Sequence, residues 1–171
     1  MKKLFVSLFI IPFLVSCSST PTDYTDKKNR KYSDYSACSL SVIKDEMFTQ
    51  EENLYGVYIY REECGACNNI KGALFDYLDS QRNNTNKGVS KIYLYKRIRS
   101  SEGITGDLQY FKGSIYDATD IDAYIREMVG KNRTEDIYIR GTPSLYIIKD
   151  NSFFDYYYEA NSIASYLVKN K

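Results

Sequence analysis

Residues 54–78 have the sequence LYGVYIYREECGACNNIKGALFDYL. The apolar run at 54–60 is rich in β-favouring residues and predicts a buried strand. Four apolar residues then recur at helical spacing, namely Ile70, Leu74, Tyr77 and Leu78. This stripe predicts a helix that ends near Asn83 and Asn84. The motif Cys64-Gly65-Ala66-Cys67 therefore lies where a strand leads into a helix, and its two cysteines can close a small disulfide ring.

A C-x-x-C motif can be half of a zinc site, a haem attachment site or a redox pair. Zinc needs two further ligands, and the sequence contains no histidine and no second C-x-x-C. Haem attachment needs a histidine after the second cysteine, where this chain has Asn68. The absence of histidine also excludes Ser-His-Asp and Cys-His nucleophiles. A redox pair remains by elimination, with a Cu(I) carrier as a less favoured alternative, and we expect neither a metal nor a cofactor.

Weaker patterns on either side extend this unit to the element order αβαβαββα. Ahead of the first strand, Leu40, Ile43 and Met47 indicate a helix that also contains Cys38. We expect Cys38 to be a small buried residue, with a third redox thiol or a site of intermolecular pairing as the alternatives. The downstream elements are a strand at 91–97, a helix from an Asp120 N-cap to about Gly130, strands at 144–149 and 153–159 joined by an Asp150-Asn151 turn, and a last helix capped by Asn161 or Ser162. Residues 98–119 have no clear period.

The composition fits one compact domain that is close to electrical neutrality. The chain has 171 residues, of which 43% are hydrophobic, with 23 Lys and Arg against 22 Asp and Glu. Because phosphate backbones demand a basic surplus, nucleic acid is not an expected partner.

The N-terminus predicts export and lipid attachment. Two lysines precede an apolar stretch of about 12 residues, which is too short to span a bilayer. The segment Leu14-Val15-Ser16-Cys17 resembles the bacterial lipobox, with an ordinary signal peptide and an incidental cysteine as the alternative. We therefore expect a lipoprotein signal peptide at 1–16, lipidation of Cys17, a flexible tether at 17–36 and a folded domain at 37–171. The basic residues of the tether are expected to be solvated, with contact to anionic headgroups as the alternative: Lys27, Lys28, Arg30 and Lys31.

The element order and two short segments together resemble the thioredoxin fold. Cys64-Gly65-Ala66-Cys67 is similar to the active-site C-G-x-C of that family, and the segment 139–150 (IRGTPSLYIIKD) is similar to the segment around its cis-proline. The resemblance implies an α/β domain with a central mixed β-sheet flanked by helices, in which Pro143 is cis and packs beside the disulfide. It also implies that residues 98–119 are an insertion before the cis-proline segment, either a partner-binding surface or a longer crossover.

The same resemblance assigns roles to the site residues. Cys64, at a helix N-terminus that favours the thiolate, is the expected nucleophile, and Cys67 is the expected resolving cysteine. Gly65 and Ala66 are expected to keep the approach to the sulfurs open, and the backbone at Thr142 to pair with an extended substrate segment.

Three departures from the family's pattern concern activity. Glu62-Glu63 and Ala66 stand where thioredoxins have a tryptophan before the first cysteine and a proline within the motif, and Tyr58 stands where they keep a buried aspartate. These departures disfavour a general cytosolic reductant. We expect Glu62 and Glu63 to oppose the Cys64 thiolate and Arg61 to favour it. The alternative is that both carboxylates point into solvent and have little effect.

The sequence thus predicts a monomeric thiol–disulfide oxidoreductase that acts on protein thiols or disulfides. Its place would be the extracytoplasmic side of a bacterial cell envelope, where disulfides form, and an N-terminal lipid would hold it on the membrane. The alternative is a non-catalytic adaptor with the same fold, in which the Cys64–Cys67 bond is structural and the insertion binds a partner of an envelope or secretion assembly.

Overall fold

The computed structural model describes residues 29–97, 108–110 and 118–171. The predicted signal peptide, Cys17 and the tether up to residue 28 lie outside the described residues, as do 98–107 and 111–117 of the predicted insertion. The elements, in chain order, are the 3-10 helix η1 (Tyr32–Cys38), α1 (Ile43–Glu46), β1 (Leu54–Tyr60), α2 (Gly65–Arg82), β2 (Lys91–Lys96), β3 (Gln109–Tyr110), α3 (Ala118–Met128), the 3-10 helix η2 (Thr134–Asp136), β4 (Tyr138–Ile139), β5 (Ser144–Lys149), β6 (Ser152–Tyr157) and α4 (Ala160–Lys169). No helix among these described residues is long and apolar enough to cross a membrane.

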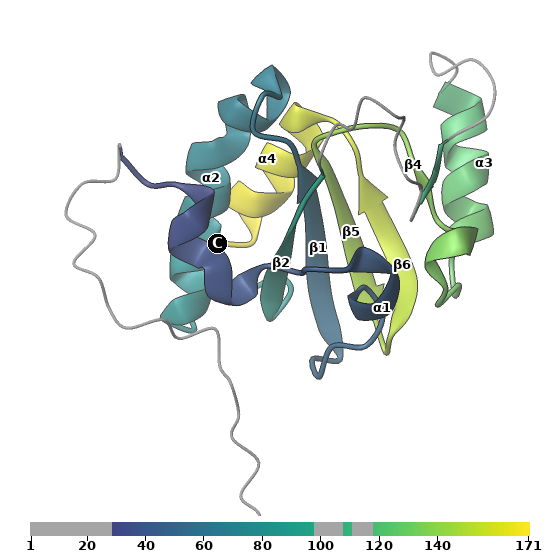
Figure 1. Ribbon diagram of the computed structural model, residues 1–171, viewed down its shortest axis with the longest axis horizontal. Helices are drawn as coiled ribbons and strands as arrows, with labels where there is room; N and C mark the ends of the chain where they lie inside the picture. The colour runs from purple at the N-terminus through teal and green to yellow at the C-terminus, as the bar shows by residue number, and fades with distance from the viewer. Residues whose placement is uncertain (1–28, 98–107, 111–117) are drawn as a thin grey trace, which may run out of the picture.

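A four-stranded mixed sheet with the order β2-β1-β5-β6 forms the centre of the domain (Figure 1). Strand β1 is parallel to β2 and antiparallel to β5, so that Val57 lies between Tyr93 and Tyr146. Strands β5 and β6 form the predicted hairpin, and Asp150 and Asn151 turn the chain with φ angles of 49° and 57°. The predicted α/β architecture with a central mixed sheet is therefore confirmed.

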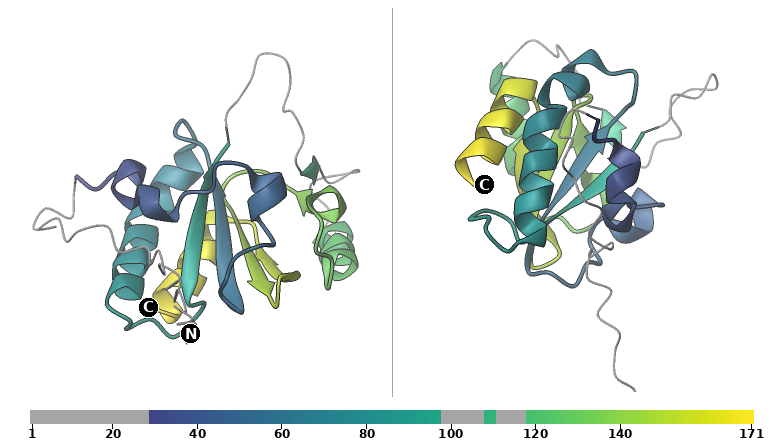
Figure 2. Two further views of the ribbon diagram at one scale, coloured as in Figure 1. Left: turned by 60° about the horizontal axis from the view of Figure 1, so that its bottom comes forward. Right: turned by 90° about the vertical axis from the view of Figure 1, so that its left-hand side faces the viewer.

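Side chains alternate between the two faces of the sheet and build two cores. In β1, Tyr58 and Tyr60 join the core beneath α2 and α4, whereas Val57 and Ile59 join the core that α1 and α3 complete. Helices α2 and α4 lie side by side, and Figure 2 shows both on one side of the sheet with α3 apart from them. Both faces of the sheet are covered. The carboxyl end of β1 and the start of α2 lie at one rim of the molecule.

The folded domain begins earlier in the chain than the predicted tether allows. Arg30 is only 7% exposed, and its guanidinium bonds Asp76 at 2.8 Å and Asp79 at 2.7 Å on α2. Tyr32 and Tyr35 of η1 are buried in the core beside α2. The prediction of a flexible tether through residue 36, with a solvated Arg30, is therefore wrong from about residue 30 onward, because these side chains find partners on α2.

The helix expected around residues 38–47 is two short elements instead of one. Cys38 ends η1, and the chain then runs along β2, where Ser39 bridges Leu94. The Leu40 N–H donates to the Leu94 carbonyl at 2.8 Å, and α1 begins only at Ile43. The apolar spacing of Leu40, Ile43 and Met47 marks residues that share a core, and all three are buried there.

Two predicted helix starts differ by a few residues. Helix α3 begins at Ala118, so Asp120 lies inside it and is not its N-cap. Helix α4 begins at Ala160 with Glu159 at the N-cap, ahead of the predicted caps Asn161 and Ser162. Alanine has the highest helix propensity, which favours both of these earlier starts.

The two outer strands of the sheet carry backbone bonds from segments outside it. On β2 the contact is the one from Leu40 described above. On β6, the Phe153 carbonyl accepts from the Gly130 N–H at 2.9 Å, and the Phe153 N–H donates to the Lys131 carbonyl at 2.7 Å. Strand β3, which lies in the predicted insertion, pairs in parallel with β4, which lies outside it.

Candidate active site at the Cys64–Cys67 disulfide

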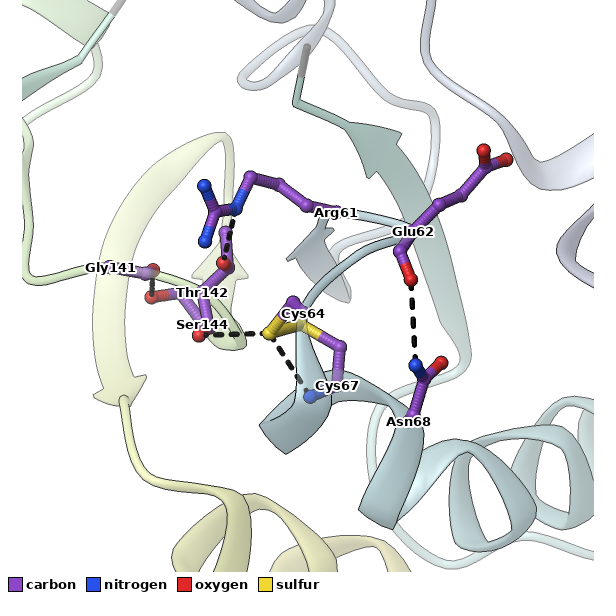
Figure 3. Close-up of a disulfide and its surroundings, with 8 residues drawn as sticks. All are labelled: Arg61, Glu62, Cys64, Cys67, Asn68, Gly141, Thr142 and Ser144. Atoms are coloured by element: carbon purple, nitrogen blue, oxygen red, sulfur yellow. Dashed lines mark hydrogen bonds between the residues drawn. A yellow bond between two sulfur atoms is a disulfide. The ribbon is translucent and has the colours of Figure 1, made fainter. Parts of the chain in front are cut away.

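Cys64 and Cys67 form a disulfide at the junction of β1 and α2. Strand β1 ends at Tyr60, a three-residue loop follows, and Cys64 is the N-cap of α2. The two Cα atoms are 5.2 Å apart, as the short spacing predicts. Strand, loop and helix N-terminus together thus present the two sulfurs at one rim of the sheet (Figure 3).

Both cysteines of the disulfide are buried. Cys67 is fully buried, and Cys64 is only 6% exposed. The carbonyl oxygen of Thr142 lies 3.3 Å from Cys64 Sγ and covers it on one side. Gly65 and Ala66 are exposed, and a Cβ built on Gly65 would meet no atom within 4 Å. The surface at Gly65 and Ala66 is therefore uncrowded, whereas the Thr142 carbonyl lies against one side of Cys64 Sγ.

The start of α2 favours a negative charge on Cys64. The backbone N–H of Cys67 donates to Cys64 Sγ at 3.1 Å, and no acidic residue lies in the first turn of the helix. Unsatisfied N–H groups and the positive end of the helix dipole both stabilise a thiolate at this position.

A loop that precedes β5 forms the other wall of the site. The Thr142–Pro143 peptide bond is cis, which is the geometry that the sequence resemblance implied, and Pro143 is buried. The Ser144 hydroxyl, which is fully buried, donates to the Gly141 carbonyl at 2.7 Å. The loop thereby holds the Thr142 carbonyl against the disulfide.

Tyr156 on β6 fixes this loop from below, and sequence reasoning missed it. Its hydroxyl accepts from the Arg140 N–H at 3.1 Å and shares a hydrogen bond with the Ser144 hydroxyl at 2.8 Å. Burial raises the pKa of Tyr156 above its ordinary value, which keeps the hydroxyl neutral and able to donate. The position of Tyr156 opposite Tyr146 in the hairpin is the signal that could have found it.

The charged residues between β1 and α2 diverge. The Arg61 Nε donates to the Thr142 hydroxyl at 3.2 Å, on the side of the cis-proline loop. Glu62 points the opposite way (Figure 3), where its carboxylate pairs with Lys96 of β2 at 2.9 Å. Glu63 is exposed. Because Lys96 offsets the charge of Glu62 and water surrounds both carboxylates, the structure favours the alternative that these glutamates have little effect on Cys64.

A layer of tyrosines lies beneath the disulfide. Tyr58 and Tyr60 share the core with Cys64 and Cys67, and Tyr32 of η1 stacks on Tyr60 with ring centroids 3.8 Å apart. Burial raises the pKa of Tyr60 to about 12 and that of Tyr58 far higher. Among the residues that the structure describes, the buried hydroxyls of Tyr32 and Tyr58 find no hydrogen-bond partner. Tyr58 therefore supplies a neutral aromatic group where the resemblance would place a carboxylate.

Cys38 lies apart from this chemistry. It is 6% exposed, as expected for a small buried residue, and takes no part in the disulfide. Within the part of the chain that the structure describes, no three cysteine or acidic side chains cluster in a way that could hold a metal ion.

Comparisons with known proteins return likeness only at the level of structure. No family model and no curated protein matches the chain. Solved structures similar to it include the oxidised thioredoxin from Plasmodium falciparum, at 12% identity, a TM-score of 0.40 and coverage of 77% of this chain and 94% of that one. Mitochondrial thioredoxin 3 from Saccharomyces cerevisiae is 11% identical with a TM-score of 0.38, and the match covers 75% of this chain and 86% of that one. Fasciola hepatica thioredoxin is 12% identical with a TM-score of 0.38, and the match covers 78% of this chain and 96% of that one.

The chain's own geometry defines its class. A mixed sheet of order β2-β1-β5-β6, a disulfide at the N-terminus of the helix after β1, and a cis-proline before β5 are together a thioredoxin-like fold. The fold class inferred from the sequence is confirmed.

Proposed function

We propose that this protein is a thiol–disulfide oxidoreductase that exchanges disulfides with protein substrates at Cys64 and Cys67. One observation carries the proposal: the disulfide caps the N-terminus of α2, opposite the carbonyl of Thr142 and below the exposed Gly65-Ala66 pair. A disulfide with a purely structural role does not need a helix N-terminus to stabilise its thiolate.

The exchange proceeds in two balanced steps. In the reduced protein, the Cys64 thiolate attacks a client disulfide, whose S–S bond breaks, so that a mixed disulfide forms and one client thiolate leaves. Cys67, once deprotonated, then attacks Cys64 Sγ, which closes the Cys64–Cys67 bond and releases the second client thiolate. Two electrons pass from protein to client, and the reverse sequence oxidises a client dithiol.

The neighbouring residues support this sequence of steps. The Cys67 N–H stabilises the Cys64 thiolate, and the full burial of Cys67 keeps it from competing for clients. Proline has no N–H, so the loop at Pro143 leaves the backbone of Thr142 to pair with an extended client segment. No cofactor takes part in the proposed reaction.

The equilibrium reduction potential of the Cys64–Cys67 pair is the first test. A soluble chain that begins after Cys17 is equilibrated in glutathione and dithiothreitol buffers, and the two states are resolved by alkylation. A potential near or below about −250 mV indicates a reductant, and one of about −120 to −180 mV indicates an oxidase or isomerase. A bond that resists all but harsh reduction contradicts the proposal and favours the adaptor.

Trapping of clients provides a second readout. Cys67→Ser should accumulate mixed disulfides at Cys64, Cys64→Ser should accumulate none, and Cys38→Ser is the matched control that should behave as the unaltered protein. If Cys64→Ser retains function, the disulfide is structural and the protein acts as an adaptor.

The proposal extends to a lipid anchor at Cys17 on the extracytoplasmic side of the envelope. Its support is the lipobox-like segment Leu14-Val15-Ser16-Cys17 after a charged and apolar leader. Metabolic labelling with palmitate should mark the full chain and not Cys17→Ser, and detergent partitioning should follow the label. Labelling of Cys17→Ser to the same extent would refute lipidation at this residue.

A further inference from the structure

Arg61 occupies the space between the active-site loop and the cis-proline loop. It follows directly after β1, is half-buried, and donates from Nε to the Thr142 hydroxyl at 3.2 Å. The carbonyl of the same threonine lies 3.3 Å from Cys64 Sγ. Figure 3 shows the guanidinium on the Thr142 side of the disulfide, away from Glu62. Arg61 therefore lies beside the site where a client segment would meet the sulfur.

The guanidinium of Arg61 has donors to spare. A guanidinium carries five N–H donors, and Thr142 occupies one of them. Two carboxylates near this rim pair with other cations: Glu62 pairs with Lys96, and Glu159 pairs with Arg140 at 3.2 Å. No carboxylate lies within 4.0 Å of Arg61 among the residues that the structure describes.

We propose that Arg61 selects clients that carry a carboxylate next to the reacting cysteine. The inference rests on the proposed exchange activity and adds to it a preference for acidic client segments. A client strand aligned along Thr142 places the side chain adjacent to its cysteine near the guanidinium. A carboxylate matches the planar fork of arginine and can accept two parallel hydrogen bonds from it.

Partial burial lets the Arg61 guanidinium bind a client carboxylate more strongly than a charge on a mobile surface side chain would. The bond to Thr142 already restricts the Arg61 side chain, so a client carboxylate has less motion to arrest. The exposed Glu63 acts against the preference, but water screens it, and no bond directs it toward the cis-proline loop. The net effect is a moderate preference for acidic clients.

Three end-capped peptides test the proposal. Each holds one internal disulfide, and they differ only in the residue before the first cysteine, which is Glu, Gln or Lys. The fully reduced protein is mixed with each peptide, and the second-order rate of its oxidation is followed. The readout is the ratio of the Glu-peptide rate to the Gln-peptide rate, since any effect of a variant on the Cys64 thiolate changes all three rates together.

We expect the unaltered protein to prefer the Glu peptide by about three- to fivefold at low salt and by less than about twofold in 0.5 M NaCl. Arg61→Gln keeps a donor for Thr142 but should lower the ratio to about one, and Arg61→Glu should favour the Lys peptide. Lys131→Gln is the matched control, because this exposed lysine follows α3 at the opposite end of the sheet and should leave the ratio unchanged.

The possible failures are distinct. Equal rates for all three peptides, or an undiminished ratio in Arg61→Gln, would overturn the role of Arg61 and leave the exchange activity intact. Failure of the unaltered protein to react with any peptide would overturn the exchange activity, and the role of Arg61 with it.

Discussion

Replacement of Arg30 by methionine tests whether the polar segment before η1 is part of the folded domain. Arg30→Met keeps an unbranched aliphatic side chain and removes the guanidinium, which bonds Asp76 and Asp79 and lies over the Phe75 ring. Loss of one member of a fully buried ion pair costs about 3 to 5 kcal/mol. The Arg30 side chain is 5% exposed, but the two carboxylates are 31% and 29% exposed, so water can hydrate them after the change.

The remaining partners reduce the effect further. Asp76 still bonds Lys171 at 3.0 Å, and Asp79 still accepts from the Tyr35 hydroxyl at 2.9 Å. We therefore expect Arg30→Met to lower the free energy of unfolding by about 2 kcal/mol, which corresponds to a fall of roughly 6 to 8 °C in Tm for a domain of this size.

Urea denaturation of chains that begin after Cys17 measures this difference. Lys31→Met is the matched control, because the exposed neighbouring side chain should change stability by less than about 0.5 kcal/mol. If Arg30→Met and Lys31→Met have equal stability, the segment does not contribute to the fold and the assignment of its boundary at about residue 30 is wrong.

The difference in stability between the unaltered protein and Arg30→Met depends on pH. Partial burial acts to raise the pKa of Asp76, but Lys171 and Arg30 together outweigh it and hold the pKa below its ordinary value. Such a carboxylate stabilises the fold above its unfolded pKa of about 4, and this contribution disappears as the pH falls through the folded pKa. The difference between the unaltered protein and Arg30→Met should therefore be complete at pH 7 and shrink below about pH 4.

Three further predictions concern packing, ionisation and thiol reactivity. A Cβ at Gly88 would lie 2.7 Å from the Tyr77 hydroxyl, so Gly88→Ala should destabilise the fold by about 1 to 3 kcal/mol in urea denaturation. Gly72 lies in open space within α2, so Gly72→Ala should stabilise the fold by up to about 1 kcal/mol, and equal effects of the two changes would contradict this packing. Because burial raises the pKa of Tyr60 to about 12, stability should fall as the pH rises from about 10 to 12, and ultraviolet absorbance should show no phenolate at this residue near pH 10 when compared with Tyr60→Phe. Cys38 and Cys64 are equally exposed, at 6%, but only the Cys64 thiolate is stabilised by the N-terminus of α2, so in the reduced, folded protein alkylation of Cys38 should be at least about tenfold slower, and equal rates would show that the helix does not activate Cys64.

Local patterns were sufficient for most of the fold. The apolar run of β1, the helical stripe of α2 and the Asp150-Asn151 turn each depend on residues close together in sequence, and each is found where it was predicted. The segment around Arg30 was mistaken for a tether because its order comes from carboxylates 46 and 49 positions away. A polar composition indicates disorder only when no distant partner satisfies the polar groups.

The site was predicted in its parts and not in its contacts. Spacing and the resemblance placed Cys64, Cys67 and Pro143, and the structure brings them to one rim of the sheet. The bond from Arg61 to Thr142 joins residues 81 positions apart, and no local pattern contains such a pairing. The low exposure of Cys64 likewise depends on where the Thr142 carbonyl lies once β1 and β5 have paired.

The backbone bonds on the two outer strands have a consequence for self-association. An unprotected outer strand offers free N–H and C=O groups on which a strand of a second molecule can add, and this is a common route to aggregation. Here Leu40 occupies the Leu94 carbonyl on β2, and the chain at 130–131 occupies both backbone groups of Phe153 on β6. A second molecule would have to displace these segments before it could extend the sheet at either place, so this tyrosine-rich sheet is shielded against growth into fibres there.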